Sequence, residues 1–255
     1  MKSTEGDNMK LSFKLLAALL SLLCTSFAVA DDHAAGPMGY GQSFGIKTAN
    51  PEAVVAAMSK LRGSRSHRKS PSNVVLGVVV SAGESEATHF ITVFYDSAAD
   101  MDKANAINRD SKEFAEFVQT MNGLGERQFV NLFTTERANV KEGAVTSKNP
   151  VTMVYGLAVT DPGTFTQAFD KLWASEAMQG FPGNSFFGTS VVNGDSDVTH
   201  WVSFQANDME TLLTGVRATL SSADMAEYLK TASSARTVAY ESIGAQVMTW
   251  PAAGN

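Results

Sequence analysis

The chain has 255 residues, of which 44% are hydrophobic and 18% are charged, and its formal net charge is −6. This composition is ordinary for a globular protein, and the length is sufficient for two small domains with a core each. The excess of acidic side chains, 26 against 20 basic ones, argues against nucleic acid as a partner.

The first residues predict export. In the segment that starts at Met9, Lys10 and Lys14 precede the apolar run Leu15 to Leu23, and Ala28-Val29-Ala30 follows as a small-residue cleavage site. The run is too short to span a membrane. We therefore expect residues 1–30 to be the signal peptide of a periplasmic or secreted protein, whether translation starts at Met1 or at Met9.

The expected mature N-terminus carries a candidate metal ligand. Residues 31–38 are expected to be a flexible tail that starts with Asp31-Asp32-His33. A histidine in third place behind a free amine can complete a planar set of four nitrogens, which suits Cu(II) or Ni(II). His33 is therefore a candidate copper or nickel ligand, together with the backbone of Asp31 and Asp32.

Periodicity and turn residues predict an alternation of strands and helices. The first half is expected to contain a strand at about 40–47, a helix at about 50–61, strands at about 74–80 and 88–94, helical pieces at about 97–107 and 111–121, and a strand at about 127–134. Asn50-Pro51 and Asp161-Pro162 predict helix starts. Asp110 and Ser221 are predicted to cap the second helical pieces. Residues 137–149 lack an apolar pattern and are expected to be a linker.

The second half repeats the first. Thr88-His89-Phe90-Ile91-Thr92-Val93-Phe94 returns as Thr199-His200-Trp201-Val202-Ser203-Phe204-Gln205, an offset of 200 − 89 = 111 residues. The same offset relates Gly45 to Gly156. A period of this length is that of a small domain rather than a solenoid repeat. We therefore expect two copies of one domain, at 39–136 and 150–255.

Each copy is expected to run strand, helix, strand, strand, broken helix, strand, which is the ferredoxin-like pattern. In this order and in its duplication the chain resembles the dimeric α+β barrel superfamily, without matching a specific family. The resemblance implies an α+β fold in which the two units form a barrel within one chain. Such a chain would be a monomer that resembles a dimer, and a higher oligomer is also possible. It also implies a pocket between sheet and broken helix. Members include cofactor-free monooxygenases, isomerases, small-molecule binders and haem enzymes.

The repeated strand has two unlike faces, because alternate residues of a strand point in opposite directions. His89, Ile91 and Val93 share a face suited to helix packing, as do the matching residues of the second copy. The other face mixes aromatic and polar groups, as ligand pockets do. The candidate ligand-binding residues are Phe90, Thr92, Phe94, Trp201, Ser203 and Gln205, with Phe44 and Tyr155 expected to join them.

His89 and His200 are the candidate catalytic residues, as general bases. The alternative is a structural role at the start of a strand, which duplication would preserve as well. No histidine pair has zinc-ligand spacing, and Cys24, the single cysteine, lies in the expected signal. All histidines fall outside the expected helices, whereas haem-binding members need one on a helix. No cofactor is therefore predicted.

A basic segment, residues 60–69, has no basic counterpart in the second copy. It is either a solvated loop or an anion site present in one half alone.

These observations favour an exported protein that binds a small, largely apolar molecule. Two alternatives stay open. One is a cofactor-free oxygenase or isomerase that uses His89 or His200, and the other is a structural or partner-binding protein without a ligand. Whether the protein is an enzyme is left undecided by the sequence.

Overall fold

The computed structural model describes residues 38–83, 85–194 and 196–253. The expected signal peptide, the tail up to residue 37 and the candidate metal ligand His33 lie outside these ranges. The predictions made for them therefore stay predictions.

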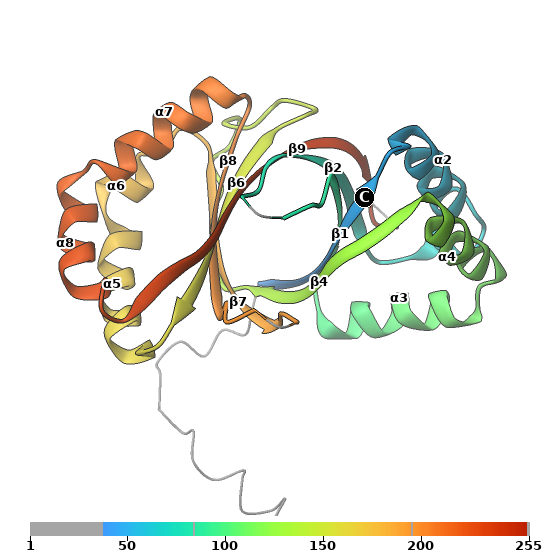
Figure 1. Ribbon diagram of the computed structural model, residues 1–255, viewed down its shortest axis with the longest axis horizontal. Coiled ribbons are helices and arrows are strands. Elements are labelled where there is room, and N and C mark those ends of the chain that lie inside the picture. The colour runs from blue at the N-terminus through green and yellow to red at the C-terminus, as the bar shows by residue number, and fades with distance from the viewer. Residues whose placement is uncertain (1–37, 84, 195, 254–255) are drawn as a thin grey trace, which may run out of the picture. The chain divides into compact units, whose positions relative to one another are not determined.

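The described residues form an α+β fold (Figure 1). The first half contains β1 (Gly39–Thr48), α2 (Pro51–Arg62), the short 3₁₀ helix η1 (His67–Lys69), β2 (Asn73–Ser81), β3 (His89–Tyr95), α3 (Ala98–Asp110), α4 (Lys112–Leu124), β4 (Gly125–Thr135) and β5 (Arg137–Asn139). The second half contains β6 (Val151–Val159), α5 (Pro162–Ala174), α6 (Glu176–Gln179), β7 (Asn184–Val192), β8 (His200–Ala206), α7 (Met209–Leu220), α8 (Ala223–Ala232) and β9 (Arg236–Trp250).

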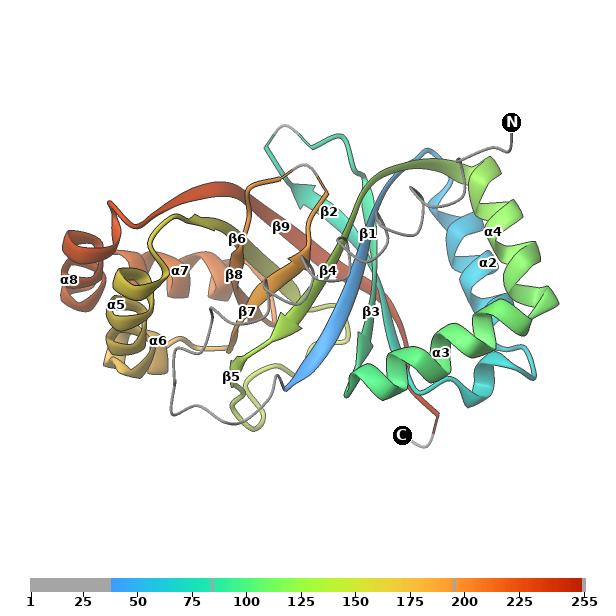
Figure 2. The same cartoon turned by 90° about the horizontal axis from the view of Figure 1, so that it is seen from below.

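Eight strands close into an antiparallel barrel. The order is β4-β1-β3-β2-β9-β6-β8-β7, and β7 pairs back onto β4 through Phe133↔Ser190 and Leu132↔Val192. The two halves therefore meet along two seams, β2–β9 and β4–β7. The short strand β5 extends the second seam by pairing with β7. Helices α2, α3 and α4 cover the outside of one half and α5 to α8 the outside of the other (Figures 1 and 2).

The buried cores lie between the strands and these helices. The first-half cluster contains six buried residues, among them Val54 of α2 and Leu76 of β2. The second-half cluster contains 18, among them Phe165 of α5 and Phe204 of β8. The second half is therefore much more completely packed than the first.

The helix starts follow the capping rules, with one correction in each half. Asn50 accepts a hydrogen bond from the backbone N–H of Ala53 at 3.1 Å, as predicted for α2. The predicted cap Asp110 is instead the last residue of α3, and Ser111 caps α4 by accepting from the N–H of Phe114 at 3.1 Å. In the same way Ser222, not Ser221, caps α8. Each serine marks the helix break itself, one residue later than predicted.

Three residues of the segment expected to be a linker form β5, because they find partners in the other half. The Arg137 guanidinium pairs with the Asp170 carboxylate at 2.5 Å and lies 5.9 Å from the centroid of the Phe169 ring. A search for local apolar periodicity does not detect such long-range contacts.

Strand bounds in the two halves coincide at the offset of 111 residues. Adding 111 to the bounds of β2 (73–81) gives those of β7 (184–192), and adding it to the span of β4 and β5 (125–139) gives that of β9 (236–250). One strand of the second half therefore corresponds to two consecutive strands of the first.

Candidate ligand-binding sites

The repeated strands present two faces as the alternation predicted. Ile91 belongs to the core cluster under the first-half helices, and Val93 packs against that cluster. Val202 and Phe204 belong to the second-half cluster. The alternate residues point to the other side of the sheet, into the barrel, and we call this side the interior face.

The expectation that Phe44 and Tyr155 share the interior face is wrong. Phe44 lies opposite Ile91, and Tyr155 lies opposite Val202, in antiparallel pairs whose facing residues point to the same side of the sheet. Both rings therefore face the helices. Burial raises the pKa of Tyr155 to about 12, and nearby Glu241 adds to the rise.

The three candidate residues of β3 point to the interior face, away from the helices. The Phe90 ring covers Gly77 on β2, where an added Cβ would come within 2.1 Å of it. The Thr92 hydroxyl is buried and lies 3.0 Å from the Ser43 hydroxyl on β1. Phe94 is 38% exposed near the end of the strand. These three side chains belong to one wall of the barrel.

The predicted residues of β8 lie on the opposite wall. The Trp201 ring meets the edge of Phe133 at a centroid distance of 5.3 Å. Ser203 is buried, and the Gln205 side-chain oxygen accepts from the amide of Asn184 at 3.4 Å. The structure therefore divides the six interior residues between two walls.

His89 and His200 occupy matching positions at the starts of β3 and β8. The Nδ1 of His89 lies 2.9 Å from the Thr88 hydroxyl, and that of His200 lies 2.8 Å from the Thr199 hydroxyl. Each threonine hydroxyl also forms a hydrogen bond with the backbone of the neighbouring strand. The Thr88 hydroxyl, for example, accepts one from the N–H of Thr48 at 3.0 Å. This repeated arrangement matches the structural alternative for the two histidines.

His200 is also enclosed by aromatic rings. Its ring centroid lies 5.1 Å from that of Phe165 and 5.7 Å from that of Phe187, nearly parallel to the latter at 17°. Burial lowers the pKa of His200, and Glu136 partly opposes the shift. Burial also lowers the pKa of His89. Both rings are thereby held neutral at pH 7.

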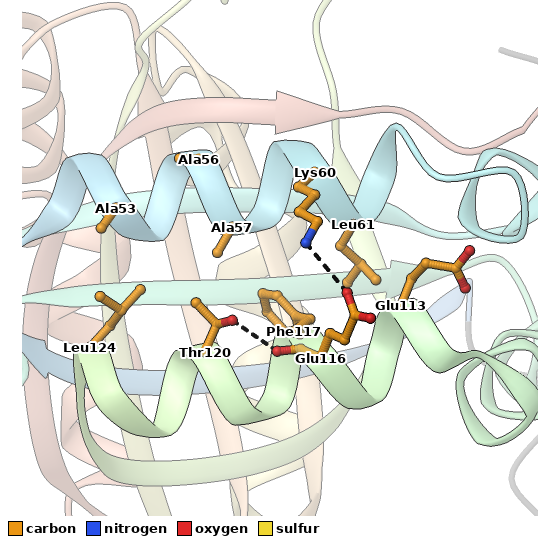
Figure 3. Close-up of a pocket in the computed structure, with 10 residues that line it drawn as sticks. All are labelled: Ala53, Ala56, Ala57, Lys60, Leu61, Glu113, Glu116, Phe117, Thr120 and Leu124. Atoms are coloured by element: carbon orange, nitrogen blue, oxygen red, sulfur yellow. Dashed lines mark hydrogen bonds and ion pairs between the residues drawn. The ribbon is translucent and has the colours of Figure 1, made fainter.

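A groove lies on the helix side of the first half, between α2 and α4 (Figure 3). Its volume is about 310 Å³. Apolar side chains form its floor and walls, and the lining residues are Ala53, Ala56, Ala57, Leu61, Phe117 and Leu124. A polar rim is made by Lys60, Glu113, Glu116 and Thr120. Lys60 and Glu116 pair across the groove at 3.3 Å.

Small side chains on α2 leave this space open. Ala53 and Ala57 are partly exposed, and no residue of α4, which is described in full, is buried. In the second half the position that matches Phe117 is Tyr228, which is 5% exposed and belongs to the core cluster. Phe169 packs edge to face on that ring at 6.3 Å. In the second half, aromatic side chains thus occupy the space that is open in the first half.

Comparisons with solved structures identify the fold. A monooxygenase candidate from Lactobacillus acidophilus NCFM matches with a TM-score of 0.54 and 13% identity, over 86% of this chain and 98% of that one. One from Fusobacterium nucleatum subsp. nucleatum matches with a TM-score of 0.58 and 10% identity, over 86% and 95%. An engineered variant of chlorite dismutase from Candidatus Nitrospira defluvii matches with a TM-score of 0.52 and 11% identity, over 84% and 93%.

The chain has the dimeric α+β barrel fold. Since nearly the whole of each neighbouring chain is covered, those proteins also carry both halves of the barrel in one chain. No protein-family model matches the sequence, and no curated protein matches it either. At these low identities the likeness shows the fold alone.

A polar network that the sequence did not predict lies beside Glu113, which is on the rim of the groove. His67 is 3% exposed, its Nε2 lies 2.9 Å from the Asn108 side-chain oxygen, and its ring stacks on Phe114 at 6.0 Å. Burial lowers the pKa of His67. Glu113, on the groove rim, accepts from the Ser111 hydroxyl at 3.0 Å. The network joins η1, α3 and α4, which no local pattern connects.

The basic segment, residues 60–69, does not form a single anion-binding site. Arg62 is 8% exposed and donates hydrogen bonds to the carbonyl oxygens of Ser72 and Pro251, each at 2.8 Å. His67 is committed to Asn108. Lys60 is exposed but pairs with Glu116, and the other exposed cations of the segment are Arg65, Arg68 and Lys69. Arg62 therefore ties the C-terminal residues to the first half.

Within residues 38–83, 85–194 and 196–253, no group of three or more histidine, cysteine, aspartate or glutamate side chains is placed to hold a metal ion. No helix in these ranges is long and apolar enough to cross a membrane.

Proposed function

We propose that this protein binds one small, largely apolar molecule in the α2–α4 groove. The observation that carries the proposal is the difference between the halves: the groove is open beside Phe117 and filled beside Tyr228. Apolar floors with a few polar groups at the rim are typical of small-molecule sites. The groove also lies beside the broken helix, where the resemblance to the barrel superfamily implies a pocket.

We further propose that the barrel arose by tandem duplication of a ferredoxin-like unit, and that the mature protein is exported. The coincidence of strand bounds at 111 residues supports the first point. The lysines, apolar run and alanine site of residues 9–30 support the second. With both units in one chain, the protein is expected to be a monomer.

A cofactor-free oxygenase is the second candidate. Two structural neighbours are monooxygenase candidates, which favours this class over an isomerase. Neither His89 nor His200 lines the groove, so a reaction there would use other residues. The rim carboxylate of Glu113 is ionised at neutral pH, because its own backbone N–H and the Ser111 hydroxyl lower its pKa. Because Glu116 is paired with Lys60, Glu113 is the rim carboxylate that would accept a proton from a bound molecule, although its lowered pKa makes it a weak base.

The binding test uses N-phenyl-1-naphthylamine, an apolar dye that fluoresces in apolar sites. We expect the protein to bind one equivalent, and Ala57→Leu, which fills the groove floor, to weaken binding about tenfold or more, equivalent to about 1.4 kcal/mol. Ala218→Leu is the matched control, the same change at an exposed alanine on α7 of the other half. Equal affinity of both variants would exclude the groove as the site.

Native mass spectrometry of protein from its own source identifies the bound molecule, and that molecule separates the two candidate functions. Incubation with and without oxygen, followed by mass analysis, should leave it unchanged if the protein only binds. An oxygen-dependent product that Glu113→Gln abolishes would establish the oxygenase.

A further inference from the structure

The interior face of the barrel carries a set of aromatic side chains that none of the described helices, α2 to α8, covers. Phe129 and Phe133 of β4 lie opposite Gly45 and Gly41 of β1. Tyr240 of β9 lies opposite Gly156 of β6. Together with Phe90 of β3 and Trp201 of β8, these rings line the barrel from both halves.

The large apolar side chains of this face remain accessible. Phe129 and Tyr240 are each 37% exposed. On the other face of the strands, Leu76 and Phe204 are 1% and 4% exposed. In the part of the chain that the structure describes, both core clusters lie under the helices and contain no interior-facing residue. Two sheets packed into a solid core would bury these rings, so the side chains of residues 38–83, 85–194 and 196–253 do not close the interior by themselves.

Glycines hold the rings along the wall. A Cβ added to Gly77 would come within 2.1 Å of the Phe90 ring, and one added to Gly156 within 2.2 Å of the Tyr240 ring. Each ring therefore lies on the backbone of a neighbouring strand instead of crossing the barrel. An eight-stranded barrel is wide enough to hold one small ligand when its side chains leave the centre open.

Tyr240 contributes a phenol to this wall. Burial raises the pKa of its phenol, although more than a third of the side chain can be reached by solvent.

Trp201 provides a polar group on this wall. Its Nε1 is shielded from solvent and has no hydrogen-bond partner among the described residues. A shielded donor without an acceptor is unfavourable, and a bound acceptor relieves this cost.

We propose that the barrel interior is a second binding chamber, which takes a planar aromatic molecule with one hydrogen-bond acceptor directed at Trp201. Aromatic walls stack on planar apolar rings, and the indole N–H selects the acceptor. The sheet separates this chamber from the α2–α4 groove. The inference therefore does not depend on the function proposed for the groove.

Two probes of the same shape test the chamber: 2-acetylnaphthalene, whose carbonyl accepts a hydrogen bond, and 2-ethylnaphthalene, which has no acceptor. The indole N–H signals of the three tryptophans are followed by nitrogen-15 NMR, and Trp201→Phe identifies the Trp201 signal. We expect 2-acetylnaphthalene to shift that signal downfield and to bind roughly 3- to 10-fold more tightly than 2-ethylnaphthalene.

Variants separate the chamber from other sites. Ser242 is partly exposed and faces Val154 on the interior face, so Ser242→Phe should reduce the affinity for both probes about tenfold or more. Ser59→Phe, the same change at an exposed position of α2, should not. Ala57→Leu in the groove should leave the Trp201 shift unchanged.

Trp201→Phe should abolish the preference for 2-acetylnaphthalene while 2-ethylnaphthalene still binds. This comparison tests the chamber even if Ser242→Phe fails to fold. The proposal is overturned if saturating 2-acetylnaphthalene leaves the Trp201 signal in place. It is also overturned if Ala57→Leu removes the shift, because the probe would then be in the groove.

Discussion

At the scale of single residues, one buried and two partly buried histidines make the stability of this protein sensitive to pH. Burial lowers the pKa of His67, His89 and His200 in the folded state. The unfolded chain then binds more protons than the folded one near pH 6.5, so stability rises with pH in this range. The contribution is fully present above about pH 6.5 and is lost as the pH falls through that value toward the folded pKa.

His200→Phe should therefore weaken the dependence of stability on pH. Phenylalanine retains the ring between Phe165 and Phe187 and removes the titrating group. We expect the loss of unfolding free energy between pH 7.5 and pH 5 to be smaller in the variant. Urea unfolding at several pH values measures it, and an unchanged slope would contradict the lowered pKa of His200.

The side chain of Ser111 should contribute more to the stability of the folded protein than that of its neighbour Asp110. Its hydroxyl accepts from the N–H of Phe114 and donates to Glu113 at 3.0 Å. Ser111→Ala should cost about 0.5–2 kcal/mol of unfolding free energy, the usual effect of a lost helix cap. Asp110→Ala should change stability by less than about 0.5 kcal/mol, because that side chain is 80% exposed. Thermal unfolding distinguishes this order from the reverse order that the sequence predicted.

At the scale of elements, period-two alternation predicted the two faces of β3 and β8 because it is a property of one strand. The facing of Phe44 and Tyr155 depends on the register with a neighbouring strand, which their own segments do not encode. The groove depends on the sizes of side chains on two separate helices. Register and cavities arise from long-range packing, so sequence periodicity left them undetermined.

Glycine and aromatic partners on adjacent strands should be energetically coupled. A Cβ on Gly45 would come within 2.1 Å of the Phe129 ring, so Gly45→Ala should cost about 1–3 kcal/mol. Combining Gly45→Ala with Phe129→Ala should recover part of the lost stability in a double-mutant cycle. Additive effects of Gly45→Ala and Phe129→Ala would show that the ring does not occupy this position.

Gly123 in α4 is the contrasting case, because it has open space around it. Gly123→Ala should therefore stabilise the protein by about 0.5–1 kcal/mol.

At the scale of the whole molecule, β9 joins the two halves. It pairs with β6 of its own half and with β2 of the other. Its last residue, Trp250, packs against the first-half core cluster, whereas Trp173 packs against the second-half cluster. Separating the halves would expose strand edges and uncover both seams. Each half therefore depends on the other for its stability.

The two halves should consequently unfold in one cooperative transition. In a Trp173→Phe, Trp201→Phe variant the remaining fluorescence comes from Trp250 and reports on the first half. In a Trp201→Phe, Trp250→Phe variant it comes from Trp173 and reports on the second. Circular dichroism measures the urea midpoint for loss of secondary structure in each variant, and so accounts for the effect of the substitutions on stability. In both variants we expect the tryptophan fluorescence to change at that same midpoint. An earlier midpoint for Trp250 would show that the sparsely packed first half opens while the second remains folded.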